Sequence, residues 1–395
     1  MMRWWGILFC AFLSCQTVAM TSKAVETQVA ASAPLELLKT GKYAELDAQL
    51  NGLQSAYEHG KTDDMAVLTL FRAFYQPDPS LEPYFVEWRK RYPDSYAAHL
   101  ALGIYYKYQG RKARGGAWAS ETSPGRFASM DLAFSSALPE LNKALTLTKK
   151  PVVTYVHLID IAAHEGDRDA ADAYLAAGNR ADPHNFIVRM KYMEMLQPRW
   201  LGREGDMQAF YKRCKADGLK RGQLNFLQAQ ILENDAFDRD DAGIEDVVTR
   251  DDYAKAIALI APHSTWLPST LYVTLLTRAG ALSFQLDDYK SALKYAELGV
   301  KVAPESATLF QLRGISELKL DRHKQAIADI QRAADLGDAW SQVYMGDLYA
   351  KGETVAKDYG KARALFEAAA KQGSQDAVQN LKALDDLEAS GSKAQ

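Results

Sequence analysis

The chain has 395 residues, of which 48% are hydrophobic and 25% are charged, and this composition excludes collagen-like and intrinsically disordered proteins. Its length exceeds the usual size of one compact core, so we expect two helical domains or one long superhelix. Because 47 Lys and Arg residues are offset by 50 Asp and Glu residues, the net charge is -3 and nucleic acid is not expected as a partner.

Residues 1–20 have the layout of a secretory signal peptide. Arg3 precedes an uncharged apolar run from Trp4 to Ser14, which is too short to span a bilayer, since spanning takes about 20 apolar residues. We therefore expect an exported protein of the bacterial periplasm or cell envelope. A retained interfacial anchor and a cytosolic chain whose apolar start has no targeting role are the alternatives.

Two processing sites compete in this leader. The small residues of Thr17 to Ala19 suit an ordinary signal peptidase, whereas Phe12 to Cys15 resembles an imperfect lipoprotein box. Cleavage near Ala19 is preferred over lipidation of Cys15, and any membrane contact is expected only through the N-terminus. Residues 21–33 are small and polar, and we expect them to form a linker.

After this linker, apolar residues recur at spacings of three and four, as in Leu46, Leu50, Leu53 and Tyr57. This periodicity predicts amphipathic helices, and sustained strand-like alternation is absent. We therefore predict an all-α fold whose first part, residues 34–235, is an irregular helical domain with repeat-like helix pairs.

An insertion interrupts one of these pairs, and a later loop has similar chemistry. The Arg and Trp residues of the two segments are Arg114, Trp118, Arg126, Arg199, Trp200 and Arg203. Arg binds carboxylates through paired hydrogen bonds and Trp stacks on planar groups, so both segments are candidate binding loops. The alternatives are that both tryptophans fill the core, or that the arginines line a small-molecule pocket.

The region from Leu35 to Leu219 resembles a bacterial family known as domain of unknown function 4034. The resemblance rests on three segments, Leu102–Tyr106, Arg114–Trp118 and Pro198–Gly202. It implies a helical, repeat-like domain without an assigned activity that is often joined to tetratricopeptide repeats.

Three side chains suggest a metal site, but the set is incomplete. A helix would place His157, Asp160 and His164 on one face, yet zinc sites usually need a further ligand, so we interpret them as a surface or groove stripe. Asp238 and Asp240 imitate the start of a calcium loop that Ala242 breaks. We expect no metal or other cofactor, and we expect residues 236–252 to be an acidic linker.

The mature chain offers no internal disulfide, because Cys10 and Cys15 lie in the leader and Cys214 stands alone. Basic neighbours favour a Cys214 thiolate. However, Cys214 shares a helical stripe with Met207 and Phe210, which predicts a buried, inert thiol. No phosphate loop or hydrolase motif is present, and we expect no catalytic residue.

A 34-residue period appears in the second half of the chain. It separates Gly280 from Gly314 and Ala292 from Ala326, and small residues at these places let paired helices cross closely. Residues 253–338 therefore resemble tetratricopeptide repeats. Residues 339–377 resemble a Sel-one-like repeat through Met345-Gly346, Gly352 and Lys357-Asp358-Tyr359, and residues 378–395 complete the chain as a C-terminal helix and tail.

In such repeats the first helix of each unit lines a groove. The matching candidate residues here are Thr277, Arg278, Phe284, Gln311, Lys319, Trp340 and Asp347. Thr277 and Ala281 stand where some tetratricopeptide domains carry a clamp for a chaperone's C-terminus, which disfavours that partner.

These features predict a non-enzymatic α-solenoid of the cell envelope that binds a partner protein or peptide through its groove. The alternative is an N-terminal domain that binds a small molecule, or acts as an enzyme, through the Arg and Trp loop.

Overall fold

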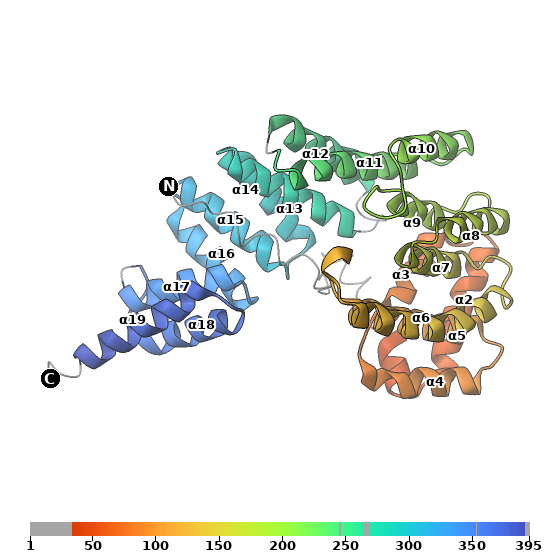
Figure 1. Cartoon of the computed structure of the whole chain (residues 1–395), viewed down its shortest axis with the longest axis horizontal. Helices are drawn as coiled ribbons and strands as arrows, with labels where there is room; N and C mark the ends of the chain where they lie inside the picture. Colours follow the sequence, from red (N-terminus) through yellow and green to blue (C-terminus); the bar gives the residue numbers. More distant parts are fainter. Residues whose placement is uncertain (1–33, 245, 264–268, 353, 392–395) are drawn as a thin grey trace. The chain divides into compact units, whose positions relative to one another are not determined.

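The computed structural model describes residues 34–244, 246–263, 269–352 and 354–391. The expected signal peptide, the linker at 21–33 and the lipidation candidate Cys15 lie outside these residues. The described part of the chain divides into two compact units, with the boundary between Ile231 and Leu232. None of its helices combines the length and apolar character needed to cross a membrane. All its regular elements are helices, which confirms the predicted all-α fold (Figure 1).

The first unit consists mainly of antiparallel helix pairs. α5 packs along α6, α7 packs along α8, and α9 lies against α7. Its α-helices are α2 (Tyr43–Glu58), α3 (Asp64–Phe71), α4 (Glu82–Arg91), α5 (Tyr96–Arg114), α6 (Pro124–Leu145), α7 (Val152–Glu165), α8 (Arg168–Ala181), α9 (Ile187–Met195) and α10 (Asp206–Ala216). Short 3₁₀ turns lie at Arg72–Phe74, Pro79–Leu81 and Ala119–Glu121.

The inserted segment lengthens the α5–α6 pair. α5 continues to Arg114, and α6 begins at Pro124 after a short turn. The two helices approach closely because α5 has glycine at two crossings. A Cβ added at Gly103 would lie 2.7 Å from the Leu141 side chain, and one at Gly110 would lie 2.8 Å from the Phe134 ring.

The N-terminal helices α2 and α3 are tied to the repeats that follow them. The Tyr57 hydroxyl donates to Asp182 over 2.5 Å, across 125 residues of sequence. Asp64 accepts the backbone N–H groups of Ile187, at 3.0 Å, and of Phe186. A carboxylate at the first turn of α9 also satisfies the helix dipole. These helices are therefore an integral part of the first unit.

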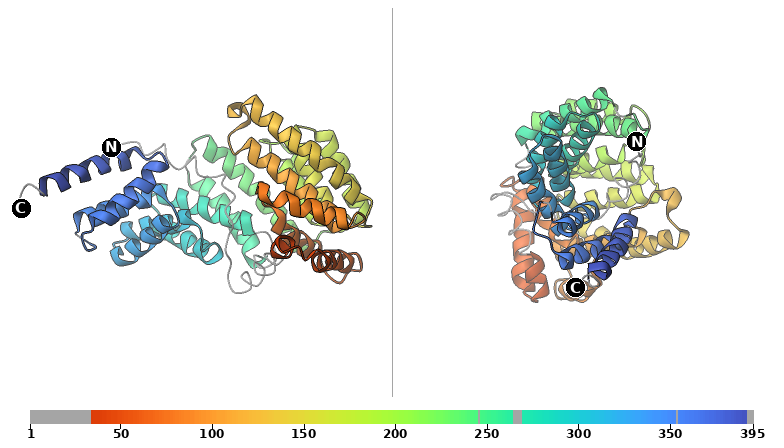
Figure 2. Two further views of the ribbon diagram at one scale, coloured as in Figure 1. Left: turned by 90° about the horizontal axis from the view of Figure 1, so that it is seen from below. Right: turned by 90° about the vertical axis from the view of Figure 1, so that its left-hand side faces the viewer.

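In the second unit, each helix from α12 to α19 packs on the next (Figures 1 and 2). A short 3₁₀ turn at Ala261–His263 follows α12. The helices are α12 (Val247–Ile260), α13 (Ser269–Gln285), α14 (Tyr289–Val302), α15 (Ala307–Lys319), α16 (His323–Asp335), α17 (Ala339–Lys351), α18 (Tyr359–Lys371) and α19 (Gln375–Gly391). Side-chain caps fix several starts; for example, Asp288 accepts the Ser291 N–H.

The predicted close crossings occur in this stack. A Cβ at Gly280 would lie 2.6 Å from Leu312, and one at Gly346 would lie 2.5 Å from Phe366. Glycine is required at both positions because a side chain there would push the neighbouring helix away. The stacked pairs form a tetratricopeptide-like solenoid, as the period predicts.

The stretch 236–252 differs from the acidic linker expected from its composition. α11 (Arg221–Asp241) continues through its first part and crosses the unit boundary, and α12 begins at Val247. Arg239 contacts Asp252 at 2.5 Å, and Arg278 contacts Asp240 at 3.1 Å. Both ends of the stretch are therefore helical, and arginines pair with two of its carboxylates.

Candidate functional site

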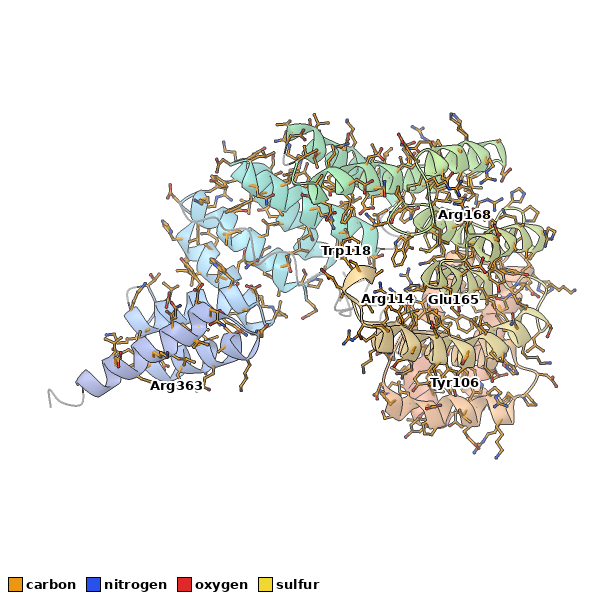
Figure 3. The ribbon with its side chains drawn as sticks, in the orientation of Figure 1. Tyr106, Arg114, Trp118, Glu165, Arg168 and Arg363 are labelled. Atoms are coloured by element: carbon orange, nitrogen blue, oxygen red, sulfur yellow. The ribbon has the colours of Figure 1, made fainter. Side chains whose placement is uncertain are left out.

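The arginines of the inserted segment bind their own loop. Arg114 donates to the carbonyl oxygens of Gly115 and Ala117, each at 3.0 Å, and Arg126 donates to the Arg114 carbonyl at 3.1 Å. Trp118 is 51% exposed, so it does not fill the core. Figure 3 labels Arg114 and Trp118 at this end of the α5–α6 pair. The segment presents an exposed tryptophan on a loop that the arginines stabilise.

The second Arg and Trp loop is fixed by packing. Trp200 is 37% exposed and its ring lies 5.3 Å from the ring of His164. The Arg203 N–H donates to Asp206 at 3.0 Å. At Gly202 an added Cβ would lie 1.8 Å from the Leu196 carbonyl oxygen, so this loop requires glycine. Neither of the two pockets described below is lined by the six Arg and Trp candidates.

Several predicted groove residues in the second unit have structural partners. Thr277 is buried and donates to the Val273 carbonyl, while Arg278 pairs with Asp240. Gln311 donates to Asp338 at 3.0 Å, which links α15 to the start of α17. Asp347 accepts from Asn380 at 2.9 Å. Thr277 thus bonds within α13, whereas Arg278, Gln311 and Asp347 hold neighbouring helices together.

The aromatic members of the predicted groove remain half-buried. The rings of Trp340 and Tyr344 stack with their centroids 5.2 Å apart, and both pack over a small core that includes Met345. Phe284 lies 5.2 Å from Tyr289, over whose ring the Lys319 ammonium is positioned at 5.6 Å. The second unit therefore presents aromatic surface on α17 and an aromatic and basic group at the ends of α13 and α15.

A charged cluster of the first unit surrounds Asp160 on α7. We call Lys107, Arg111, Asp160, Lys191 and Glu194 the Asp160 cluster. Lys107 contacts one Asp160 oxygen at 2.6 Å and Arg111 lies 3.8 Å from the same oxygen, while Lys191 contacts the other at 3.2 Å. Lys191 also contacts Glu194 at 2.8 Å. Helices α5, α7 and α9 thus meet at one carboxylate.

Burial and charge set the ionisation of this cluster. Burial alone would raise the pKa of Asp160, but the charges of Lys107 and Lys191 outweigh it and hold that pKa well below its usual value. Burial lowers the pKa of Lys107 to about 8, with Asp160 opposing the shift. Burial also lowers the pKa of Lys191, but Asp160 and Glu194 reverse the effect and the net shift is upward.

An aromatic wall borders the Asp160 cluster. Tyr75 and Tyr108 stack with centroids 4.3 Å apart, and the Lys107 ammonium lies 4.5 Å from the centre of the Tyr108 ring. The Nε2 atom of His157 lies 3.5 Å from the Tyr75 hydroxyl. His157 is 1% exposed, and within the described part of the chain its Nδ1 atom has no hydrogen-bond partner.

The structure gives Asp160 a role as the shared partner of lysine and arginine side chains. Its oxygens face ammonium groups, and the described residues contain no group of three side chains suited to hold a metal ion. Lys107 and Lys191 were not among the predicted site residues. For Lys107 the sequence does carry a signal, because it lies among buried apolar residues of α5 such as Ile104, where a lysine requires a partner.

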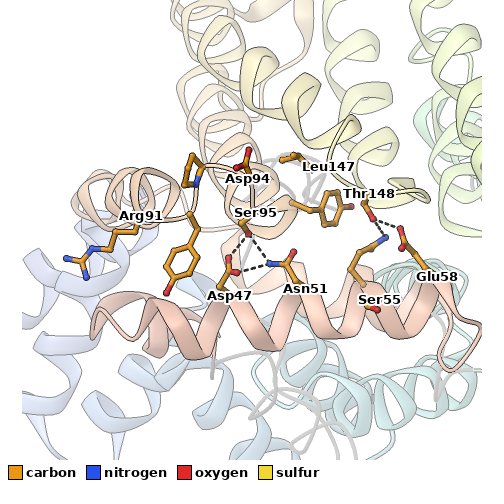
Figure 4. A pocket seen from close by; sticks show the side chains of 13 residues that line it. Asp47, Asn51, Ser55, Glu58, Arg91, Asp94, Ser95, Leu147 and Thr148 are labelled. Atoms are coloured by element: carbon orange, nitrogen blue, oxygen red, sulfur yellow. Dashed lines mark hydrogen bonds between the residues drawn. The ribbon is translucent and has the colours of Figure 1, made fainter.

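A polar pocket of about 540 Å³ lies between α2 and the turns that precede α5 and α7 (Figure 4). Asp47 accepts from Ser95 at 2.5 Å and from Trp88 at 3.1 Å. Glu58 accepts the backbone N–H groups of Lys149 and Lys150. Because these acceptors are used to attach α2 to the repeats, we interpret the pocket as structural.

A second pocket, of about 330 Å³, lies between α8 and its neighbours. Arg168, labelled in Figure 3, contacts Asp206 at 2.9 Å and Asp172 at 3.0 Å, and Tyr192 also donates to Asp172. Arg168 and Asp172, which both line this pocket, are thus paired with each other.

Comparison with known proteins finds a family similarity in the N-terminal part of the first unit. Residues 32–168 match the family model described as "Domain of unknown function (DUF4034)". The match confirms the resemblance seen in the sequence, and it covers less than half of the chain. The insertion and most of the Asp160 cluster fall within the matched residues.

Two further similarities concern repeat proteins. A stretch of 71 residues is 31% identical to the Protein STIP1 homolog of Dictyostelium discoideum, which is 18% of this chain but only 13% of that protein. The chain thus matches a small part of this curated relative. The crystal structure of the P58(IPK) TPR domain aligns with 93% of this chain and 99% of its own, at 15% identity and a TM-score of 0.26.

Proposed function

We propose that the chain is a protein-interaction scaffold. In the second unit, the surface formed by the first helix of each helix pair, α13, α15 and α17, binds a segment of a partner protein. The observation that carries this proposal is the stacked Trp340–Tyr344 pair, which remains half-buried on α17. Large aromatic side chains at such positions are frequent energetic centres of interfaces. Leu318 packs over the same core and extends the apolar surface onto α15.

The chemistry of this face favours a peptide with an apolar anchor residue. The stacked rings offer a flat apolar surface, while Lys319 is exposed on α15 and supplies a positive charge on a neighbouring part of the stack. Such a mixed surface suits an extended or helical segment. Catalysis is not part of the proposal, and the small-molecule alternative loses its support because Arg114 and Arg126 are bound to loop carbonyls.

Affinity capture with single-residue variants tests this function. Trp340→Ala is expected to weaken recovery of a specific partner by roughly tenfold or more, since truncation of a central aromatic residue commonly costs more than 1.4 kcal/mol. Tyr84→Ala, at a residue that is 39% exposed on α4, is the matched control and should leave recovery unchanged. Equal recovery by both variants would exclude this face.

We further propose that the chain is exported and works in the cell envelope, which rests on the apolar leader described above. Mass spectrometry of the native N-terminus tests it. A terminus near Met20 or an acylated Cys15 would support export, whereas an intact Met1 on a protein recovered only from the cytosol would contradict it.

A further inference from the structure

The polar pocket beside α2 keeps unused acceptors after α2 has been attached to the repeats (Figure 4). Oε1 of Glu58 accepts from the Thr148 hydroxyl and from the backbone N–H groups of Lys149 and Lys150. All three donors reach the same oxygen, so Oε2 of Glu58 keeps lone pairs for a further donor. The bonds to Oε1 hold the carboxylate in place, and a ligand would therefore meet an acceptor that is already positioned.

Gln54 supplies a second acceptor on the wall of this pocket. Its side chain is 3% exposed. The amide nitrogen donates to the Thr148 hydroxyl at 3.2 Å and to the Lys150 carbonyl at 3.0 Å, which fixes the orientation of the amide. Among the described residues, Oε1 of Gln54 has no hydrogen-bond partner. A buried carbonyl oxygen that lacks a partner is costly, so an N–H donor brought by a ligand would stabilise it.

The pocket carries a negative charge. Asp47, Glu58 and Asp94 line it, and Arg91 is the one basic residue among the described lining residues. Three negative charges and one positive charge sum to -2. The Arg91 side chain contacts Glu87, which does not line the pocket, at 2.7 Å, so its charge is already paired. The pocket is thus electrostatically suited to a cation.

The uncompensated charge rests on Asp47 and Glu58. The Asp94 side chain is 89% exposed and lies 3.9 Å from the Lys143 ammonium, so its charge is directed elsewhere. The donors to Asp47 are neutral side chains, those of Asn51, Trp88 and Ser95. Neutral donors hold a carboxylate in position but leave its charge in place.

The surroundings of Glu58 keep it ionised near neutral pH. Burial acts to raise its pKa, but the hydrogen bonds from Thr148 and from two backbone N–H groups outweigh burial, and the net shift of the pKa is downward. The Lys150 ammonium contacts Asp182 at 3.4 Å, away from this carboxylate. Glu58 therefore presents a negative charge to the pocket.

The size and lining of the pocket favour an organic cation. Its volume of about 540 Å³ holds a ligand of many atoms. Tyr92 and Leu147 also line it and offer apolar surface for a carbon chain. Asp47, Gln54 and Glu58 are separated by seven and four residues, which places all three acceptors on one face of α2. An ammonium group has three N–H donors, enough for more than one of these acceptors.

We propose that this pocket, besides attaching α2, binds an alkylammonium group, which donates to Oε2 of Glu58 and Oε1 of Gln54 while Asp47 adds a second negative charge. Hydrogen bonds between charged partners are shorter and about twice as strong as those between neutral ones. The site lies within the first unit, and its test does not involve the surface of α17.

Nuclear magnetic resonance of the full chain, with ¹⁵N in the indole rings of its seven tryptophans, tests this site. Butylammonium chloride replaces sodium chloride at constant ionic strength, so that general screening does not change. The Trp88 signal is expected to shift saturably, because its N–H donates to Asp47 at 3.1 Å. The Trp118 signal, from beyond the other end of α5, should stay in place. No saturable shift at Trp88, or the same shift with neutral 1-butanol, would overturn the proposal.

A pair of substitutions on α2 separates the site from a general charge effect. Glu58→Gln is expected to weaken butylammonium binding by roughly tenfold or more, because a hydrogen bond to a charged acceptor is lost. Glu45→Gln removes the same charge from an exposed position that does not line the pocket, and it should leave binding unchanged. Equal binding by the two variants would reject the site.

Ser55→Lys tests the site without removing any bond that attaches α2. Ser55 is exposed and lines the pocket, and its hydroxyl contacts His59 of the same helix. The introduced ammonium is tethered beside the acceptors, so it should compete with butylammonium and abolish the saturable Trp88 shift. Undiminished binding by a folded Ser55→Lys protein would contradict the proposal, and this holds even where Glu58→Gln does not fold.

The source of the ammonium group is distinguished with N-acetyl-lysine methylamide, which presents a lysine side chain between two peptide bonds. Tighter binding of this compound than of butylammonium indicates a lysine side chain of a partner protein, and equal or weaker binding indicates a free small amine. The same compound acetylated at its side-chain nitrogen carries no charge and should not bind. If it bound as tightly as the charged form, recognition of an ammonium group would be refuted.

Discussion

Gly314 lies directly against the backbone of Ala326, so that a Cβ added at Gly314 would be 3.1 Å from the Ala326 carbonyl oxygen. The same Cβ would lie 2.7 Å from Cγ1 of Ile330. α15 and α16 therefore cross at the distance that only glycine permits. This contact joins the 34-residue period of the sequence to the stacking of the second unit.

Gly314→Val is expected to destabilise the second unit by about 1–3 kcal/mol, because the added atoms overpack the crossing. Urea unfolding measures the change. Gly125→Ala is the matched control, since nothing lies within 4 Å of a Cβ at that position in α6. Its effect should be neutral or slightly stabilising. A loss of stability as large in the control as in Gly314→Val would contradict the close crossing.

Asp160→Asn should destabilise the first unit by about 3–5 kcal/mol, because it leaves two buried or partly buried ammonium groups without their carboxylate. Thermal and urea unfolding of the full chain measure this. Asp131→Asn, at an exposed position on α6, controls for the loss of a negative charge. Equal stability of the two variants would show that the Asp160 cluster is not an integral part of the core.

The stability of the second unit should depend on pH through Glu317, which is 7% exposed. Burial, followed by the charge of Asp329, raises the pKa of Glu317 from 4.5 to about 7. The folded state therefore binds this proton more tightly than the unfolded state. The contribution of Glu317 to the free energy of unfolding falls as the pH rises from about 4.5 to about 7, and is constant above that.

Glu317→Gln removes this dependence. The free energy of unfolding of the variant, relative to that of the unchanged protein, should therefore increase as the pH rises over the same range. Urea unfolding at about pH 5 and about pH 8 compares the two proteins. Glu297→Gln, at an exposed residue of α14, serves as the control. The same stability difference at both pH values for Glu317→Gln would contradict the assignment.

Cys214 should react slowly with thiol reagents until the chain unfolds. Its side chain is 0% exposed, and burial raises the pKa of its thiol to about 11, so little thiolate forms near neutral pH. Ser135→Cys, at an exposed position on α6, places a reactive thiol on the same protein and should be labelled first. Equal labelling rates at the two positions under native conditions would contradict the burial of Cys214.

Local patterns in the sequence predicted the helices and their crossings well. The period that pairs Gly314 with Ala326 has a direct steric meaning, and the stripe of Met207, Phe210 and Cys214 is buried as predicted. These features depend on residues that are close in sequence or repeat regularly. Their geometry therefore follows from helix periodicity alone.

Contacts between distant residues could not be predicted in this way. Tyr57 meets Asp182 across 125 residues, and Asp160 meets Lys107 across 53. No regular spacing connects such pairs, so the attachment of α2 and the Asp160 cluster appear only in the folded chain. The loop arginines show that side-chain chemistry alone does not predict a binding site. Arg114 and Arg126 have the chemistry of such a site, but they donate hydrogen bonds to backbone carbonyls of their own loop.

The central claim is that the surface of α17 around Trp340 and Tyr344 binds a partner protein. Site-specific photo-crosslinking in intact cells tests this claim most directly. A photoreactive amino acid placed at Tyr344 should form a discrete adduct with a partner, whereas the same group at the exposed residue Tyr84 should not form that adduct. Identical adducts from both positions, or none from Tyr344 in a correctly folded protein, would contradict the claim.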